Sequence, residues 1–308
     1  MKDARATTAV LGFPGYRPQA ERLAAAVGAV CEDVDIRHFP DGESLVRLPE
    51  RVPEHVIVCC TLNDPNRQLI ELALTSATAR TLGAARVSLV APYLCYMRQD
   101  KAFRPGEAVS QRIIGEFLAR RFDALVTVDP HLHRTHRLQD AVPNARALAV
   151  TAAPVMAAWL TSRPWEPLIV GPDEESEQWV RRIASAGGYE YCVARKQRFG
   201  DRDVRITLPH RDFAGRDVVL VDDVISSGHT IGEAARQIVG KGAASVVVLV
   251  CHALFAAGAL EHVEAAGVTE IVSTDSVPHP SNQLHLDHLL SEGLGRAWSN
   301  GNQAVQGG

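Results

Sequence analysis

Residues 218–230 read VVLVDDVISSGHT, and this stretch decides the fold of the second half of the chain. Its first four residues are apolar on both faces of an extended strand, as expected in a parallel sheet that helices cover on both sides. Two adjacent carboxylates follow, Asp222 and Asp223, and then a small polar turn that runs into a helical pattern. A strand, a turn and a helix in this order are typical of α/β architecture.

The turn in this stretch has the composition of a phosphate-binding loop. A helix N-terminus presents backbone N–H groups that favour an anion, and Gly228 permits a close backbone approach. Asp222 and Asp223 could reach ribose hydroxyls directly or through a metal. The hydroxyl donors for a 5-phosphate would be Ser226, Ser227 and Thr230. The alternative is an ordinary strand-to-helix turn with Asp and Ser as caps, which the full pattern D-D-x-x-x-S-G-x-T disfavours.

Strand-like and helix-like segments alternate along the rest of the chain. Apolar runs predict further strands at residues 8–13, 55–60, 87–91, 124–128, 168–171, 191–194, 246–250 and 271–273. Helical periodicity predicts helices at residues 19–29, 66–83, 108–121, 151–160, 176–186, 228–240 and 257–266. We therefore expect two α/β domains, 1–147 and 148–298, and a frayed tail at 299–308. Residues 34–48 break the alternation and predict a hairpin or flap.

The composition is that of a globular protein in a reducing compartment. The 308 residues carry a net charge of −4, which argues against a general nucleic-acid binder. The six cysteines show no C-x-x-C spacing, which favours free thiols over a disulfide framework or a zinc site. Residues 1–8 show no secretory signal, and no stretch predicts a membrane span. We expect a cytoplasmic protein without nucleic-acid or membrane partners.

Further polar segments lie at or near the ends of predicted strands. They read RHFPDGE at 37–43, PYLCYMRQDK at 92–101, VDPHLH at 128–133, GPDEES at 171–176 and ARKQR at 194–198. Each has an ordinary structural interpretation. The first would be a tight Asp-Gly hairpin turn and the second a solvated loop. The His-x-His pair of the third could instead suggest zinc, but no Cys or acidic partner completes a spaced motif, and His133 and His136 are interpreted as surface histidines. The fourth would be an acidic first turn of a helix, and the fifth an exposed basic strand end.

Together with the phosphate loop, these segments resemble the ribose-phosphate pyrophosphokinases, also called phosphoribosyl pyrophosphate synthetases. The resemblance runs in order from Phe39 to about Pro278. It implies two phosphoribosyltransferase-like α/β domains with an N-terminal flap hairpin. It also implies diphosphoryl transfer from Mg-ATP to ribose 5-phosphate, with Mg²⁺ as cofactor. A homo-oligomer of at least two subunits is implied as well, because the family often completes its ATP site across a subunit interface.

The resemblance carries residue roles onto the matching positions. The ATP-binding residues would be Phe39, Asp41, Glu43, Arg98 and Gln99. The residues that bind ribose 5-phosphate would be Asp222, Asp223, Ser226, Ser227, Gly228 and Thr230. The residues that help to bind Mg²⁺ would be His131 and Asp173, and the catalytic residues, on an arm that closes over ATP, would be Lys196 and Arg198. Glu174 and Glu175 stand where many family members have glycines, which leaves the geometry around Asp173 open.

Two other functions remain open on the sequence. A type I phosphoribosyltransferase would use the same loop, but it would leave the segments around Phe39 and Arg98 unexplained. A non-catalytic regulatory homologue would have no need of Lys196, Arg198 and His131. The patterns of a P-loop kinase, G-x-x-x-x-G-K-[ST], and of a dinucleotide site, G-x-G-x-x-G, do not occur in the sequence.

Overall fold

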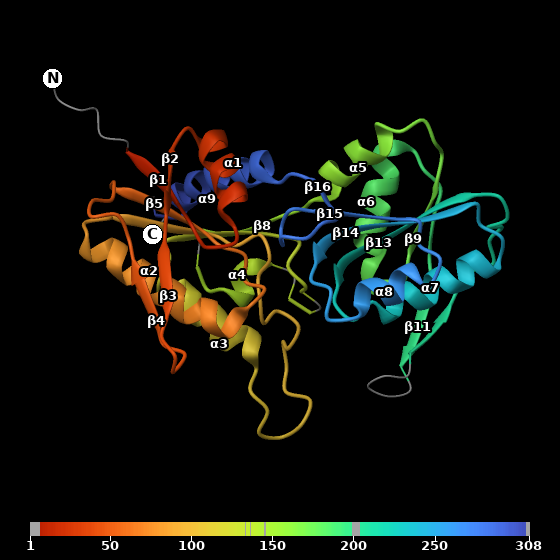
Figure 1. Ribbon diagram of the computed structural model, residues 1–308, viewed down its shortest axis with the longest axis horizontal. Coiled ribbons are helices and arrows are strands. Elements are labelled where there is room, and N and C mark those ends of the chain that lie inside the picture. The colour runs from red at the N-terminus through yellow and green to blue at the C-terminus, as the bar shows by residue number, and fades with distance from the viewer. Residues whose placement is uncertain (1–6, 133, 136, 145, 199–203, 306–308) are drawn as a thin grey trace. The chain divides into compact units, whose positions relative to one another are not determined.

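The computed structural model describes residues 7–132, 134–135, 137–144, 146–198 and 204–305 (Figure 1). The side chains of residues 197–198, 204–205 and 300–305 lie outside this description. The chain forms two compact units, the first of residues 1–150 and 287–308 and the second of residues 151–286. Each unit is built on a parallel sheet flanked by helices, so the predicted α/β class is confirmed.

The first unit contains a six-stranded parallel sheet with the order β2-β1-β5-β6-β7-β8. Its strands are β1 (Thr8–Gly12), β2 (Val30–Asp33), β5 (His55–Cys59), β6 (Arg86–Val90), β7 (Ala124–Val128) and β8 (Ala147–Val150). Its helices are α1 (Arg17–Val27), α2 (Pro65–Thr81), α3 (Ser110–Ala119), α4 (Leu138–Ala141) and α9 (Asp287–Val305). Helices α1 and α9 cover one face of the sheet, and α2, α3 and α4 cover the other (Figure 1). Every residue of β7 is buried, as two covered faces require.

The second unit contains a six-stranded parallel sheet with the order β10-β9-β13-β14-β15-β16. Its strands are β9 (Leu168–Gly171), β10 (Tyr191–Val193), β13 (Asp217–Ile225), β14 (Ser245–Ala253), β15 (Glu270–Thr274) and β16 (Asn282–Leu284). Its helices are α5 (Ala153–Thr161), the 3₁₀ helix η1 (Glu174–Ser176), α6 (Glu177–Gly187), α7 (His229–Gly240) and α8 (Ala259–Glu264). The strand order reverses between β9 and β13, and ligands of open α/β sheets bind at such a reversal.

Two antiparallel hairpins stand outside the six-stranded sheets. Strands β3 (Asp35–His38) and β4 (Ser44–Arg47) form the hairpin that the sequence predicted within residues 34–48. Strands β11 (Arg195–Arg198) and β12 (Val204–Thr207) form the other hairpin, in the second unit. Each hairpin carries residues that the sequence assigned to the site.

The C-terminal end of the chain corrects the predicted domain division. We predicted residues 287–298 in the second domain and a frayed tail at 299–308, whereas α9 belongs to the first unit and continues to Val305. Gly293 allows α9 to lie close to the sheet, because an added Cβ would be 2.9 Å from Val126 Cγ1. The pattern of one helix does not reveal which of two sheets it covers, so the sequence did not predict this arrangement.

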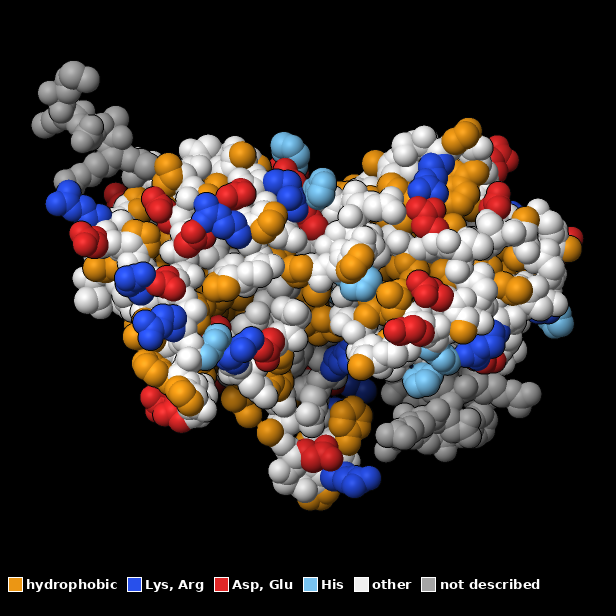
Figure 2. Space-filling view, viewed as in Figure 1, with side chains coloured by type: hydrophobic (Ala, Val, Ile, Leu, Met, Phe, Trp, Pro, Cys, Tyr) orange, Lys and Arg blue, Asp and Glu red, His pale blue; other side chains and the backbone are white. Residues whose placement is uncertain are grey.

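All six cysteines are free thiols. Burial raises the pKa of Cys95 to about 12 and that of Cys192 to about 11, so these two act as small apolar side chains. Among the helices that the structure describes, none is long and apolar enough to cross a bilayer. On the face shown in Figure 2, acidic and basic side chains are interspersed among the residues drawn in colour.

Candidate functional site

Strand β13 contains both loop aspartates. We predicted that the strand would end at Val221, but its pairing with β14 continues to Ile225, which lies opposite Ala253. Asp222 Oδ1 accepts a hydrogen bond from the Asp223 backbone N–H at 3.0 Å. The two carboxylates are therefore positioned by a regular strand in the middle of the sheet, next to the reversal of strand order.

Residues 226–230 form the turn from β13 into α7, which begins at His229. Gly228 has a φ of 72°, and an added Cβ would lie 2.8 Å from Val263 Cγ2 and 3.0 Å from the Ala259 carbonyl oxygen. Only glycine fits there without a shift of α8. The first turn of a helix leaves backbone N–H groups without intrahelical acceptors, and these groups favour a phosphate. The hydroxyl side chains at this turn belong to Ser226, Ser227 and Thr230.

Asp173 follows β9, the neighbour of β13, and its side chain is held from several directions. Its Oδ1 accepts from the Glu175 N–H at 3.1 Å, and its Oδ2 lies 2.9 Å from Lys196 Nζ. Ser176 Oγ donates to the Asp173 carbonyl at 2.6 Å. Gly171 makes room for this turn, because an added Cβ would lie 2.4 Å from Ser176 Oγ. The acidic residues in place of glycines therefore form a short helical turn that fixes Asp173.

Lys196 lies on β11, and its ammonium joins the carboxylates of the second unit. Its backbone N–H donates to Glu174 Oε2 at 3.3 Å. The paired strand β12 is attached to α7, because Gln237 Nε2 donates to the Ile206 carbonyl at 2.9 Å. The base of the β11–β12 hairpin is thus tied both to the turn after β9 and to the helix that starts at the phosphate loop. Arg198 also lies on β11, but its side chain is outside the described residues.

The electrostatic environment of Asp222 suits a cation. Burial raises the pKa of Asp222 well above its usual range, and the negative charges of Asp223 and Asp173 raise it further, whereas Lys196 lowers it. Clustered carboxylates provide the oxygen ligands that Mg²⁺ prefers, so these residues fit the cofactor that the resemblance implies. Within the described part of the chain, no three His, Cys, Asp or Glu side chains form a ready metal cage.

In the first unit, the segments that follow β6 and β7 lie side by side. The Pro92 carbonyl accepts from the Val128 N–H at 3.1 Å. Arg134 Nη1 lies 2.5 Å from Asp100 Oδ1, which forms an ion pair between the two segments. His131 belongs to the second of these segments and is partly buried. The structure therefore brings the P-Y-x-x-Y-x-R-Q-D-K segment next to the segment of His131.

Arg98 and Gln99 belong to the first of these two segments. The Arg98 side chain is exposed, and Gln99 Oε1 accepts from Ser110 Oγ at 3.4 Å. The backbone before them takes a left-handed conformation at Tyr96, where φ is 61°. The Tyr96 hydroxyl donates to Asn66 Oδ1 at the start of α2. A fixed turn therefore presents an exposed guanidinium at the carboxyl end of the sheet.

Residues 39–43, which we call the flap turn, connect β3 to β4. The Phe39 N–H donates to the Glu43 carbonyl at 2.8 Å, and Asp41 Oδ1 accepts from the Glu43 N–H at 3.2 Å. Gly42 supplies the positive φ of 93° that this tight turn needs. Phe39 is 42% exposed. The hairpin hence presents an aromatic ring and two carboxylates to solvent.

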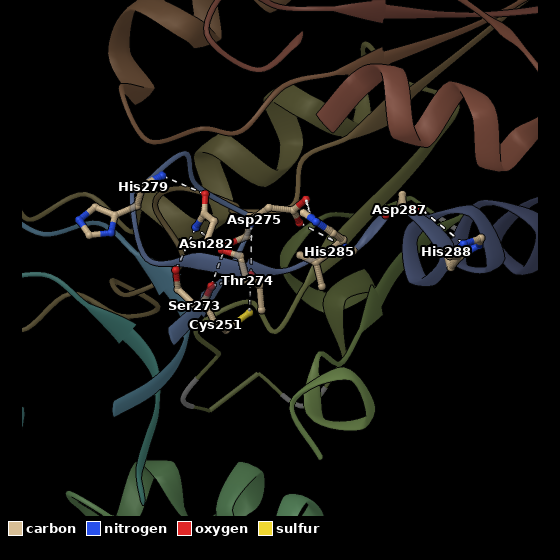
Figure 3. A network of polar contacts seen from close by, with 11 residues as sticks. Cys251, Ser273, Thr274, Asp275, His279, Asn282, His285, Asp287 and His288 are labelled. Atoms are coloured by element: carbon tan, nitrogen blue, oxygen red, sulfur yellow. Dashed lines mark hydrogen bonds and ion pairs between the residues drawn. The ribbon is translucent and has the colours of Figure 1, made fainter. Parts of the chain in front are cut away.

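A polar network links the carboxyl ends of β14 and β15 (Figure 3). Thr274 Oγ1 donates to the Cys251 carbonyl at 2.7 Å, and His252 Nδ1 lies 2.9 Å from Ser276 Oγ. His252 is opposite Val224 in the pairing of β14 with β13, so the network stands beside the strand that carries the loop aspartates. No motif in the sequence marked these residues as part of a site, although a polar run directly after an apolar strand was a usable signal.

The predicted site residues fall into two groups, one in each unit. The first unit contains Phe39, Asp41, Glu43, Arg98, Gln99 and His131. The second unit contains Asp173, Lys196, Arg198, Asp222, Asp223, Ser226, Ser227, Gly228 and Thr230. The two predicted metal ligands, His131 and Asp173, therefore belong to different units.

The fold and this loop define a phosphoribosyltransferase-like α/β protein with two such units. The family model for the N-terminal domain of ribose phosphate pyrophosphokinase matches residues 8–121, and the model for the phosphoribosyl synthetase-associated domain matches residues 205–291. The ribose-phosphate pyrophosphokinase of Methanopyrus kandleri is 37% identical over 281 residues, which cover 90% of this chain and 94% of that relative. The ribose-phosphate pyrophosphokinase 2 of Archaeoglobus fulgidus is 35% identical over 286 residues, 92% and 99% of the two chains. The chain belongs to the ribose-phosphate pyrophosphokinase family.

A solved structure shares the fold over nearly the whole chain. The crystal structure of phosphoribosylpyrophosphate synthetase from Mycobacterium smegmatis matches with a TM-score of 0.79 and 23% sequence identity. The match covers 95% of this chain and 99% of that one. The predicted fold of two phosphoribosyltransferase-like units is therefore confirmed.

Proposed function

We propose that this protein transfers the β,γ-diphosphoryl group of Mg-ATP to the C1 hydroxyl of ribose 5-phosphate, which gives phosphoribosyl pyrophosphate and AMP. Membership of the family supports this reaction. The single structural observation that carries it is the approach of Lys196 to the carboxylates at the strand-order reversal, with its Nζ 2.9 Å from Asp173 Oδ2. A phosphate loop alone would serve a phosphoribosyltransferase equally well, whereas a lysine on a hairpin arm beside that loop suits transfer from ATP.

The ribose 5-phosphate is bound by the second unit. Its phosphate lies on the turn of residues 226–230, where the backbone N–H groups of α7 and three hydroxyls donate to it. Asp222 and Asp223 accept hydrogen bonds from the ribose hydroxyls. The strand pairing that holds these carboxylates keeps the C1 hydroxyl in one orientation, which is the main requirement of this kind of transfer.

The ATP is bound by residues of the first unit. The Phe39 ring stacks on the adenine, and Asp41 and Glu43 accept from its amino group. Arg98 pairs its planar guanidinium with phosphate oxygens, and Gln99 donates to the nucleotide. The exposure of the Phe39 ring and the Arg98 side chain supports these roles, because both are available to a ligand.

The C1 oxygen attacks the β-phosphorus in line, and the bond from that phosphorus to the oxygen bridging the α-phosphorus breaks. AMP leaves with the electron pair, and the proton of the C1 hydroxyl is lost to solvent. Lys196 and Arg198 neutralise charge on the transferred and departing oxygens. No side-chain nucleophile is needed, because positioning and charge stabilisation supply most of the catalysis in such transfers. Magnesium, for which Asp173 and His131 are the assigned ligands, supplies further positive charge to the phosphates when bound.

The direct test incubates the purified protein with Mg-ATP and ribose 5-phosphate and follows the products by chromatography and ³¹P NMR. Stoichiometric AMP and an acid-labile pyrophosphoryl ester would establish the reaction. ADP with a new monophosphate ester would indicate an ordinary kinase instead. Tight binding of either substrate without turnover would favour a regulatory homologue or a transferase.

A further inference from the structure

Glu71 on α2 is a buried carboxylate that none of the roles above uses. Its side chain is 5% exposed. Burial of a charged group is costly unless hydrogen bonds compensate for the lost hydration. The hydrogen-bond partners of Glu71 therefore indicate its role. Glu71 Oε1 lies 2.8 Å from His38 Nε2 and accepts from Ser44 Oγ at 3.0 Å. The Arg67 Nε lies 3.9 Å from the same oxygen.

Both of these close partners belong to the hairpin that carries the flap turn. His38 and Ser44 lie opposite each other and form the last pair of β3 and β4 before the turn. Because side chains alternate along a strand, they share a face with Ile36 and Val46, which pack against the apolar core of the first unit. The inner face of the hairpin therefore changes from apolar to polar next to the turn, at the place where it meets Glu71.

The position of the flap turn depends on such attachments. An isolated two-stranded hairpin is at best marginally stable, and β3–β4 pairs with no strand of the larger sheet in the described part of the chain. The hairpin lies along α2 (Figure 1). The same helix holds the segment before Arg98, through the hydrogen bond from Tyr96 to Asn66. Helix α2 thus contacts both segments to which we assign ATP binding, the β3–β4 hairpin and the segment before Arg98.

We propose that Glu71 is a positioning residue for ATP, which fixes the flap turn by accepting hydrogen bonds from His38 and Ser44. Glu71 itself does not touch the nucleotide. The inference rests on the proposed role of the flap turn in ATP binding. Loss of the carboxylate acceptor leaves two donors without this partner and releases the turn, so the affinity for ATP falls. Ribose 5-phosphate binds to residues of the second unit, and its affinity stays the same.

The kinetic test compares Glu71→Leu, Glu71→Gln and the control Glu116→Gln in the full-length protein. Leu removes the acceptor, Gln keeps a carbonyl oxygen of the same reach, and Glu116 is a helix carboxylate of the same unit, 39% exposed. We expect Glu71→Leu to raise the KM for ATP about ten-fold, the scale of losing two partly buried hydrogen bonds to a charged acceptor, and to leave the KM for ribose 5-phosphate unchanged. Glu71→Gln should restore most of the ATP affinity. An unchanged KM for ATP, or an equal rise in both KM values, would overturn the proposal.

A second variant guards against misfolding of Glu71→Leu. Ser44→Ala removes one donor from a partly exposed position and should raise the KM for ATP about three-fold. If Ser44 acts through Glu71, the double variant Ser44→Ala with Glu71→Leu will show less than the sum of the two single effects on the free energy of ATP binding. Strict additivity would mean that the two residues act separately, contrary to the proposal.

Hydrogen exchange provides a readout that does not depend on turnover. The amide hydrogens of Phe39 and Gly42, which bond within the flap turn, should exchange about ten-fold faster in Glu71→Leu than in the wild type and in Glu116→Gln. Unchanged exchange would refute the attachment itself. If the wild type makes no phosphoribosyl pyrophosphate, the proposed reaction fails, and calorimetric titration of the same variants with ATP then tests Glu71 alone. Faster exchange with unchanged ATP binding would overturn its role toward the nucleotide.

Discussion

Lys196 Nζ lies 2.9 Å from Asp173 Oδ2, so the lysine assigned to the chemistry is paired with a carboxylate assigned to the metal. The two side chains are 14% and 7% exposed, and solvent therefore screens the pair little. The charges of both act on the pKa of Asp222, which shows that all three groups share one environment. The ammonium thus supplies positive charge among these carboxylates.

Lys196→Ala should lower kcat by about 10²–10³-fold, because in the proposed reaction the ammonium stabilises charge that develops on the transferred oxygens. The KM for ribose 5-phosphate should change by less than about three-fold, since we assign the 5-phosphate to the turn before α7. Steady-state kinetics with varied ribose 5-phosphate at saturating ATP measures both. Arg195→Ala, an exposed neighbour on the same strand, is the matched control. An equal loss in kcat and in ribose 5-phosphate affinity would assign Lys196 to substrate binding instead.

Asp222→Asn should stabilise the substrate-free protein at neutral pH by on the order of 1 kcal/mol. The pKa of Asp222 in the folded protein is raised, mainly by burial, above the ordinary value of 3.8. Above that value the unfolded chain loses a proton that the folded chain keeps, so ionisation favours unfolding, and the stability of the wild type falls as the pH rises. The Asn side chain has no proton to lose and keeps the Oδ1 acceptor.

Urea unfolding at about pH 3.5, 5 and 7 checks this prediction. The gain from Asp222→Asn should be near zero at the lowest pH and should grow toward neutrality. On the proposal that Mg²⁺ binds among the ionised carboxylates around Asp222, added Mg²⁺ should stabilise the wild type more than the variant. A variant that is less stable than the wild type at neutral pH would show that the carboxylate is not under electrostatic strain.

Gly228→Ala should destabilise the protein in two ways, by backbone strain at a positive φ and by steric overlap of the new Cβ. The same substitution at Gly188 measures the backbone strain alone. Gly188 has a φ of 70°, close to the 72° of Gly228, but nothing lies within 4 Å of an added Cβ there. Gly188→Ala should therefore cost about 1 kcal/mol for the backbone alone. Gly228→Ala should cost about 2–4 kcal/mol, because the new Cβ also overlaps Val263 and the Ala259 carbonyl.

The relief of that overlap moves the turn of the phosphate loop. We therefore expect the KM for ribose 5-phosphate to rise at least about ten-fold in Gly228→Ala and to stay the same in Gly188→Ala. Urea unfolding and steady-state kinetics measure the two effects. Equal destabilisation by both substitutions would mean that α8 yields to the methyl group at no cost.

The sequence predicted those features of the fold that depend on residues close together in the chain. The apolar runs predicted the central strands, and the polar turn predicted the loop at the start of α7, because both depend on neighbours in the chain. The extension of β13 to Ile225 was missed, since the two aspartates resembled a strand end while their pairing with β14 is a long-range contact. The placement of α9 was missed for the same reason.

Long-range partners also explain what was missed at the site. Lys196 and Asp173 were both recognised, but they are 23 residues apart and no local pattern reports the distance between their side chains. The sequence did not predict a role for Glu71, which lies within the run Leu69–Leu72. A carboxylate among residues whose helical pattern predicts burial was nevertheless a usable signal. Its hydrogen-bond partners, 27 and 33 residues away, are only found in the folded chain.

His55 should make the first unit sensitive to acid, because it contacts α9 from β5. Its Nε2 lies 2.8 Å from Ser88 Oγ, and its ring meets the edge of Trp298. Burial, helped by the charge of Arg86, lowers the pKa of His55 from 6.5 to about 4. Between these values the unfolded chain gains a proton that the folded chain does not, so stability is complete above pH 6.5 and is lost as the pH falls toward 4. After allowance for solvent screening, the loss amounts to about 1–2 kcal/mol.

Urea unfolding at neutral and mildly acidic pH should show this loss in the wild type and in His288→Gln, whose side chain is 90% exposed, but not in His55→Gln. The same acid loss in all three proteins would place the sensitive group elsewhere in the chain.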